Sequence, residues 1–117
     1  MYIYIIECLD NSLYTGIAKD IEKRLYEHFY KEKTCAKYTK SHQMTTLKAL
    51  WKTDTKQNAS KLEYHIKTLS RIKKQELILN PTLINSIFSN KINSSNYEYI
   101  DAEKQEIIMH KIKTKEQ

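Results

Sequence analysis

The first 30 residues constrain the fold most, because they carry the pattern of a β-hairpin followed by a helix. Residues 2–8 and 13–17 are rich in β-branched and aromatic side chains, and the Asp-Asn-Ser sequence of residues 10–12 favours a turn between them. Asp20 is a suitable N-cap, and apolar residues recur at every fourth position from Ile21 onward. The chain is therefore predicted to begin with two paired strands and an amphipathic helix.

The rest of the chain is predicted to add one strand and several helices. Residues 46–52 have the alternating pattern of a third strand. Helical patterns with a capping residue or apolar spacing follow at residues 55–69, 70–79, 81–88 and 101–113. Residues 90–97 are rich in serine and asparagine and are predicted to form a linker. The fold class is thus α/β, more closely α+β: a small three-stranded antiparallel sheet flanked by helices, with an extra C-terminal helix.

The length of the chain, 117 residues, suits a single compact domain with one modest core. No apolar run approaches the ~20 residues that a membrane-spanning helix needs. Residues 1–9 lack the basic leader and the cleavage site of a secretory signal. We therefore expect a cytoplasmic protein that does not act on a membrane.

The net charge of +6 is concentrated in the first part of the chain. Residues 1–75 contain 15 Lys and Arg against 8 Asp and Glu, whereas residues 76–117 contain 5 against 6. Residues 31–52 contain six lysines and a single acid, Glu32. This distribution suits a polyanion partner such as nucleic acid, although a solvated lysine-rich surface would have the same composition.

The strongest functional signal is a succession of short motifs with a fixed order. The motif residues are Tyr2-Ile3-Tyr4, Tyr14-Thr15-Gly16, Arg24, His28 and Glu63. This succession resembles the GIY-YIG nuclease domain, a small metal-dependent endonuclease module, and it is most similar to the compact single-domain bacterial branch. The stretches SLYTGIAKDIEKRLYEH, CAKYTK and EYHIKTLSRIKK carry the likeness further. The resemblance implies a nuclease domain at residues 1–79 and a helical C-terminal extension at residues 80–117, packed on it or tethered to it.

The resemblance also implies an active site and a role for each residue in it. The hydroxyl groups of Tyr4 and Tyr14 are expected near the attacking water, and Arg24 is expected to hold the scissile phosphate. His28 would position or exchange a proton with water or the leaving oxygen. Glu63 would bind one divalent metal, Mg²⁺ with Mn²⁺ as the alternative. The general base stays open among the two tyrosines and His28.

Strand geometry sets a condition on the two tyrosines. Tyr4 and Tyr14 share a face of the hairpin only if it pairs residues of equal parity, which requires an odd-length loop or a bulge. A three-residue loop at residues 10–12 satisfies this condition, and a two-residue turn would put the tyrosines on opposite faces. We predict the three-residue loop or an equivalent bulge. Arg24 and His28 are four residues apart and share a face of their helix.

Each of these residues also has a purely structural interpretation. The tyrosines could be packing residues, Arg24 a surface arginine and His28 a half-buried structural histidine. Glu63 could be an exposed helix residue paired with Lys67. The sequence also departs from the family pattern, since Tyr2 stands at the first glycine and Thr15 at the middle of the second motif. Ile17 stands where some members have lysine, and Asn80 is the best candidate for the asparagine of the family's last motif. These two departures leave open which residues support the active-site side chains.

Further basic and aromatic residues are predicted to contact nucleic acid. They are Lys37, Tyr38 and Lys40 in the basic loop, and Lys67, Arg71 and Lys73 in the helical region. Because no base-reading module is evident, DNA recognition is expected to follow shape or ends, as in branched, damaged or single-stranded DNA, and to be weak and salt-sensitive. The protein is expected to be a monomer or a weak homodimer.

The function predicted from the sequence is that of a metal-dependent endonuclease that hydrolyses DNA phosphodiester bonds. Two alternatives remain. The first is a catalytically weak or inactive nucleic-acid-binding module of the same fold. The second is a small interaction domain whose C-terminal helix, residues 101–113, binds a partner or a second copy.

Overall fold

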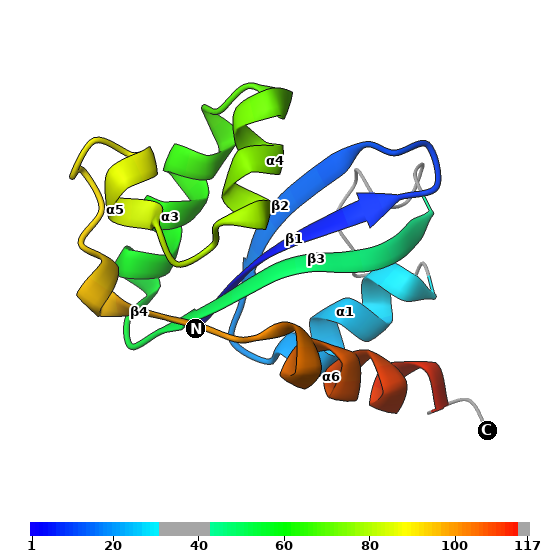
Figure 1. The fold of residues 1–117 in the computed structure, drawn as a ribbon. Helices are drawn as coiled ribbons and strands as arrows, with labels where there is room; N and C mark the ends of the chain where they lie inside the picture. Colours follow the sequence, from blue (N-terminus) through cyan, green and yellow to red (C-terminus); the bar gives the residue numbers. More distant parts are fainter. Residues whose placement is uncertain (31–42, 115–117) are drawn as a thin grey trace.

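An antiparallel sheet separates two layers of helices in the computed structural model, which describes residues 1–30 and 43–114 (Figure 1). The order of the strands across the sheet is β2-β1-β3-β4. The strands are β1 (Tyr2–Cys8), β2 (Leu13–Ala18), β3 (Met44–Thr53) and β4 (Tyr97–Tyr99). The helices are α1 (Ile21–Phe29), α3 (Lys56–Lys67), α4 (Arg71–Leu79), α5 (Ile84–Ile87), the 3₁₀ turn η1 (Ser94–Asn96) and α6 (Ala102–Thr114).

The sheet has four strands, so the prediction of three strands was wrong. The additional strand, β4, pairs with the end of β3, and Trp51 lies opposite Tyr99. The Thr53 hydroxyl donates to the Asn96 carbonyl at 2.7 Å, and the Tyr97 hydroxyl donates to the Asn58 carbonyl at 2.7 Å. Side-chain contacts with residues far away in the sequence therefore hold β4 in place. With three residues, the strand is too short to show an alternating pattern of apolar and polar residues.

Two hydrophobic cores form, and not the single core expected from the length, because both faces of the central strand β1 are covered. Ile3 and Ile5 point to the side of α3, α4 and α5, whereas Tyr4 and Ile6 point to the side of α1 and α6. Successive residues of a strand point to opposite faces, so one strand supplies both cores. The apolar stripe of α1, which includes Leu25, packs in the second core.

The predicted helix starts are confirmed at three positions. Asp20, Thr55 and Ser70 each accept a hydrogen bond from the backbone N–H three residues further on, at 3.1, 3.1 and 3.2 Å. Such caps satisfy N–H groups that have no partner within the helix. They fix where α1, α3 and α4 begin. Four of the predicted site residues lie on two of these helices, Arg24 and His28 on α1 and Glu63 and Lys67 on α3.

The β1–β2 hairpin has the odd-length loop that the tyrosines require. The Cys8 N–H donates to the Ser12 carbonyl at 2.9 Å, which leaves residues 9–11 as a three-residue loop. Asn11 adopts a left-handed conformation with φ of 67°, which asparagine tolerates better than most residues. Strand pairing joins residues of equal parity, so Tyr4 and Tyr14 share a face as predicted. The loop lies one residue earlier than residues 10–12.

The C-terminal part of the chain packs against α1. Met109 and Ile112 of α6 lie in the same core as Leu25 of α1. The Tyr30 hydroxyl donates to the Lys113 carbonyl at 3.3 Å. Residues 97–114 thus add a strand to the sheet and a helix beside α1 (Figure 1).

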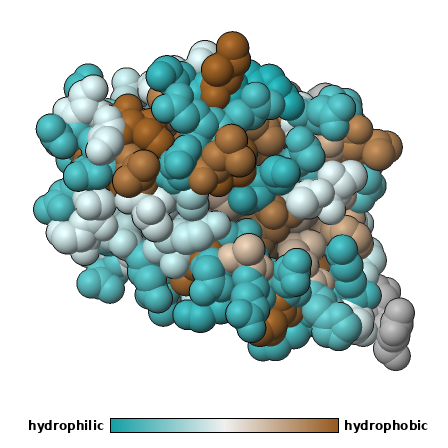
Figure 2. All heavy atoms as spheres, in the orientation of Figure 1, coloured by the Kyte–Doolittle hydropathy of each residue, from teal (hydrophilic) through white to brown (hydrophobic). Residues whose placement is uncertain are grey.

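The outer surface is mostly hydrophilic on the face seen in Figure 2, and apolar groups of side chains stand out over α4. Ile72 and Leu79 of this helix are 76% and 80% exposed, and Leu77 is its buried contact with the core. Within residues 1–30 and 43–114, none of the helices has the length and apolar character needed to cross a bilayer.

Candidate active site

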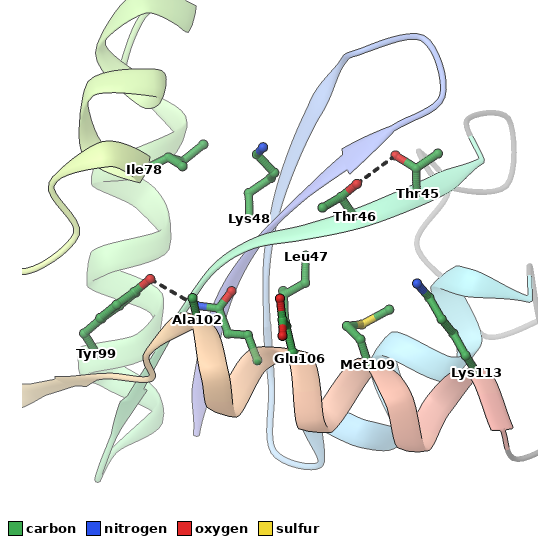
Figure 3. Close-up of a pocket in the computed structure, with 11 residues that line it drawn as sticks. Thr45, Thr46, Leu47, Lys48, Ile78, Tyr99, Ala102, Glu106, Met109 and Lys113 are labelled. Atoms are coloured by element: carbon green, nitrogen blue, oxygen red, sulfur yellow. Dashed lines mark hydrogen bonds between the residues drawn. The ribbon is translucent and has the colours of Figure 1, made fainter.

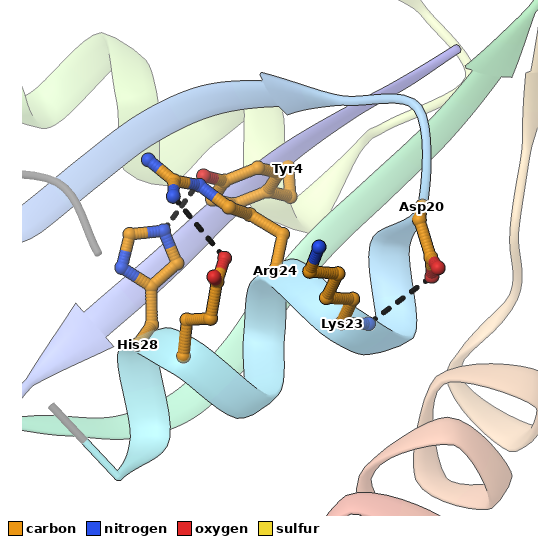
Figure 4. Close-up of polar contacts among 6 residues, drawn as sticks. Tyr4, Asp20, Lys23, Arg24 and His28 are labelled. Carbon is orange, nitrogen blue, oxygen red and sulfur yellow. Dashed lines mark hydrogen bonds and ion pairs between the residues drawn. The ribbon is translucent and has the colours of Figure 1, made fainter. Parts of the chain in front are cut away.

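Three aromatic rings meet where the hairpin faces α1. The Tyr4 hydroxyl lies 2.7 Å from Nε2 of His28, and the centroids of the two rings are 5.5 Å apart. Tyr14 completes the cluster, with its ring centroid 5.6 Å from that of His28 and 6.4 Å from that of Tyr4. Figure 4 shows His28 and Arg24 reaching from α1 toward Tyr4. The register of the hairpin and the four-residue spacing on α1 therefore bring four of the predicted residues together.

Gly16, the sole glycine of the chain, makes room for this cluster. It lies opposite Tyr4 in the β1–β2 pair. A Cβ atom on Gly16 would lie 2.6 Å from Cζ of Tyr4 and 3.1 Å from Cε2 of Tyr14. The φ angle of Gly16 is not positive, so the position needs glycine for space and not for backbone freedom. The glycine of the second motif is thus explained by the packing of the tyrosines.

Arg24 is held by a carboxylate of its own helix. Its Nη1 lies 3.3 Å from Oε1 of Glu27, whose side chain is only 12% exposed. Burial acts to lower the pKa of Arg24, but the hydrogen bonds and charges of Tyr4 and Glu27 raise it above its ordinary value. The guanidinium group therefore stays charged beside the Tyr4 hydroxyl.

Burial keeps both partners of the Tyr4–His28 hydrogen bond neutral. It raises the pKa of Tyr4 well above the ordinary value, and the neighbouring Tyr14 and Glu63 raise it further against the opposing effect of Arg24. Burial also lowers the pKa of His28 to about 4, and the charge of Arg24 acts in the same direction. Near pH 7 a neutral phenol thus faces a neutral imidazole, which can accept its proton.

Glu63 reaches the cluster from the other side of the sheet. It belongs to α3, whose buried residues pack on the face opposite to Tyr4, and it comes close enough to raise the pKa of Tyr4. The two sides meet at β2, which is an edge strand. Lys67 Nζ lies 3.3 Å from Oε2 of Glu63 and 5.9 Å from the ring centroid of Tyr14. The predicted pair of Glu63 and Lys67 is present, and it lies at the site.

The donor atoms at this place suit Mg²⁺. Glu63 provides a carboxylate with a side chain 22% exposed, and the nearby tyrosines provide phenol oxygens. All of these are hard oxygen donors, which Mg²⁺ prefers. Among the described residues, no group of three or more His, Cys, Asp and Glu could hold a metal. A metal at Glu63 would therefore complete its shell with water or phosphate oxygens, as Mg²⁺ commonly does.

The remaining predicted residues do not join this cluster. Arg71 is exposed at the start of α4, and Lys73 forms an exposed pair with Glu76 at 3.3 Å. The side chain of Asn80 donates to the Glu76 carbonyl at 3.1 Å, which makes it a C-terminal cap of α4. The predicted contacts in the basic loop, Lys37, Tyr38 and Lys40, lie outside the described residues.

Glu27 is the residue that sequence reasoning missed. It follows Arg24 by three positions on α1, a spacing at which helix side chains meet. It is 9% exposed, an unusual burial for a glutamate. The i,i+3 spacing from an arginine of the motif was the signal that could have found it.

A second concave region lies away from these residues. A groove of about 460 Å³ separates the outer part of β3 from α6 (Figure 3). Thr45 and Lys48 line one side of the groove, and Glu106 and Lys113 line the other. Because β2 and β3 lie on opposite sides of β1, the groove is distinct from the tyrosine cluster. None of the predicted site residues within residues 1–30 and 43–114 lines it.

Comparison with known proteins places the motifs in one family. The family model of the GIY-YIG catalytic domain matches residues 1–76. A UPF0213 protein of Staphylococcus saprophyticus is 53% identical over 77 residues, which cover 66% of this chain and 92% of that protein. A UPF0213 protein of Haloquadratum walsbyi is 43% identical over 84 residues, which cover 72% of this chain and 92% of that protein.

A solution NMR structure is also similar, that of a UPF0213 protein from Bacillus halodurans. The match has 34% sequence identity and a TM-score of 0.43, and it covers 79% of this chain and 95% of the other. The match to the family model spans residues 1–76 and so includes the motif positions from Tyr4 to Glu63. This chain therefore belongs to the GIY-YIG catalytic domain family.

Proposed function

We propose that the protein is a metal-dependent endonuclease that hydrolyses phosphodiester bonds in DNA. The observation that carries the proposal is the convergence of five side chains from β1, β2, α1 and α3 at one edge of the sheet. They are Tyr4, Tyr14, Arg24, His28 and Glu63. Membership in the GIY-YIG family supports nuclease activity and a nucleic acid substrate.

Arg24 is proposed to bind the scissile phosphate. Its side chain is 27% exposed, so a phosphate can reach it, and the ion pair with Glu27 restricts where the guanidinium group can point. A guanidinium group can donate two hydrogen bonds to one phosphate and offset the charge that grows in the transition state. The same charge lies beside Tyr4, so the phosphate and the proton-transfer groups would be adjacent.

Tyr4 and His28 together are proposed to act as the general base. A tyrosine with a raised pKa is a poor base by itself. The 2.7 Å hydrogen bond offers a route, in which the attacking water gives a proton to Oη of Tyr4 while the Tyr4 hydroxyl proton moves to Nε2 of His28. No free phenolate accumulates in such a transfer, and the imidazole ends as a cation. Tyr14 would orient the water from the third side of the cluster.

Glu63 is proposed to hold the divalent metal, which when bound supplies positive charge to the phosphate oxygens. A single carboxylate is enough for Mg²⁺ when phosphate and water fill the other positions. Arg71 and Lys73 are proposed to contact the phosphate backbone outside the site, because both are exposed on α4, which follows α3. Recognition of shape or ends, and not of sequence, follows from contacts of this kind.

A cleavage experiment tests this proposal. Labelled single-stranded, duplex and branched DNA are incubated with the protein and Mg²⁺ or Mn²⁺, alongside Glu63→Gln and Arg24→Ala. Each substitution is expected to lower the cleavage rate by at least about 100-fold, the usual scale for losing one charge-stabilising group. Glu103→Gln and Lys104→Ala on α6 are matched controls, since both residues are exposed, and they should cleave like the wild type.

Two outcomes would contradict the proposal. Cleavage that survives both Glu63→Gln and Arg24→Ala would show that another site performs the reaction. Binding without cleavage on every DNA would favour the inactive nucleic-acid-binding module of the same fold.

A further inference from the structure

Lys67 borders the candidate site, with a side chain that is 51% exposed. Its Nζ is 3.3 Å from the Glu63 carboxylate and 5.9 Å from the centroid of the Tyr14 ring. Lys67 follows Glu63 by one helical turn, so both side chains leave α3 on the side that faces β2. The ammonium group therefore occupies space next to the oxygen atom that a cation would use.

In the part of the chain that the structure describes, two cations of the site are each paired with a carboxylate of their own helix. Arg24 pairs with Glu27 on α1, and Lys67 pairs with Glu63 on α3, both at 3.3 Å. The two pairs differ in exposure, because the Lys67 side chain is 51% exposed and that of Arg24 is 27% exposed. Arg24 has a planar fork beside a nearly buried partner, whereas Lys67 is a point charge on a flexible stem. Lys67 can therefore leave its carboxylate more easily than Arg24 can leave Glu27.

We propose that Lys67 is an exchangeable counter-ion of Glu63, a role that rests on the proposed function. Without a divalent cation, the ammonium group neutralises the carboxylate next to Tyr14. When a divalent cation binds Glu63, the two positive groups compete for the same oxygen atoms, and Lys67 is displaced. Because its stem is half exposed, the displaced ammonium group can turn to a phosphate oxygen of the bound DNA. Lys67 is a positioning residue for the metal and a phosphate ligand for the DNA.

This role predicts opposite effects of one substitution on two ligands. Lys67→Met keeps the length of the side chain and removes the competing charge, so the metal-free protein should bind a divalent cation more tightly. The expected gain is about two- to five-fold, in line with the small strength of exposed ion pairs. The affinity for DNA in the presence of the cation should fall, and the slope of log K against log salt should become shallower by about 0.7 to 0.9. A residue with a merely structural role would not shift the two affinities in opposite directions.

The experiment measures Mn²⁺ binding without DNA, by electron paramagnetic resonance, and DNA binding with Ca²⁺, by fluorescence anisotropy at several salt concentrations. The variants are Lys67→Met, Lys67→Arg, Glu63→Gln and the control Lys104→Met, which removes an exposed lysine from α6. Lys67→Arg keeps the charge and should stay near the wild type in Mn²⁺ affinity, and so should Lys104→Met. Circular dichroism melting curves confirm that each variant is folded.

The possible failures of the two proposals are distinguishable. If Glu63→Gln abolishes Mn²⁺ binding and Lys67→Met leaves the affinity unchanged or weaker, the exchange role of Lys67 is wrong while Glu63 remains the metal ligand. If Glu63→Gln binds Mn²⁺ as tightly as the wild type, the metal assignment of the proposed function fails, and the exchange role fails with it. Tighter Mn²⁺ binding together with weaker DNA binding in Lys67→Met supports the role.

Discussion

At the scale of single residues, Tyr4 and Gly16 face each other across the β1–β2 pair, and the position of the Tyr4 ring requires a residue without a side chain at position 16. The tyrosine ring lies where a Cβ atom of residue 16 would stand. The hydroxyl group of this ring lies 2.7 Å from Nε2 of His28. Gly16 therefore affects the Tyr4–His28 hydrogen bond indirectly, because it leaves room for the Tyr4 ring.

Gly16→Ala is expected to destabilise the fold and to disturb the site. The added methyl group would lie 2.6 Å from Cζ of Tyr4, closer than real contacts allow, so the ring or the strand must move. Overpacking of this kind costs ~1–3 kcal/mol. Urea unfolding measures the loss, with Lys19→Ala, an exposed residue after the same strand, as the control. Unchanged stability and unchanged cleavage in Gly16→Ala would contradict this account of the motif.

The buried His28 is expected to make the stability of the protein depend on pH. Its pKa is lowered from 6.5 to about 4 in the folded protein, so the unfolded chain binds the proton more tightly. Stability from this group is fully present above pH 6.5 and is lost as the pH falls toward 4. The loss is on the order of 3 kcal/mol.

Urea unfolding at several pH values between 4 and 7 measures this dependence. The His28→Gln variant should show a flatter curve than the wild type. His110→Gln, which changes an exposed histidine of α6, should keep the slope of the wild type. If the His28 variant has the same slope as the wild type, the depressed pKa is not the cause of the acid destabilisation.

At the scale of elements, α6 supports the helix that carries Arg24 and His28. Ile112 of α6 is fully buried in the core shared with Leu25 of α1. Lys111 Nζ approaches Oε1 of Glu22 at 3.9 Å, a contact that adds little because both side chains are exposed. Apolar packing is therefore the main link between the C-terminal helix and the site.

Ile112→Ala is expected to cost ~2–5 kcal/mol of stability, the range for truncating a buried isoleucine. Ile107 lies on the same helix and is 52% exposed, so Ile107→Ala is a matched control that should change stability by less than about 0.5 kcal/mol. Thermal unfolding of the two variants checks the difference. Equal effects of the two substitutions would mean that α6 does not pack on the core as described.

Local signals made some elements predictable and left others hidden. The starts of α1, α3 and α4 were predictable because a cap bond joins residues only three positions apart. The odd length of the hairpin loop was predictable from the condition that Tyr4 and Tyr14 share a face, but its position was not, because the loop lies at residues 9–11 and not at 10–12. Strand β4 was not predictable, since it has three residues and is fixed by partners such as Thr53, which bonds a residue 43 positions away.

The site shows the same division. Strand parity and helix spacing placed Tyr4, Tyr14, Arg24 and His28 on facing surfaces. Glu27 escaped prediction because a glutamate on a helix is usually exposed, and only the packing of α1 on the sheet buries it. Tertiary packing, and not local pattern, decides such cases.

At the scale of the whole molecule, charge is divided unevenly between the GIY-YIG domain and the C-terminal part. Residues 1–75 carry the excess of Lys and Arg, and residues 76–117 are close to neutral. Lysines also occur on α6, but there they are balanced by acidic residues such as Glu103 and Glu106, so the excess of positive charge belongs to residues 1–75. DNA is therefore expected to contact the side that includes α3 and the start of α4, and not α6.

Arg71→Ala is expected to weaken DNA binding about equally for all sequences, because its guanidinium group would contact phosphate and not bases. Loss of one phosphate contact should reduce the slope of log K against log salt by about 0.9 on duplex DNA. Lys104→Ala removes a charge that is also exposed, from α6, and should change neither the affinity nor the slope. Anisotropy titrations with two duplexes of equal length and unrelated sequence measure both quantities. A loss limited to one duplex would mean that Arg71 reads bases, and an equal loss in Lys104→Ala would mean that the net charge of the molecule, and not its distribution, drives binding.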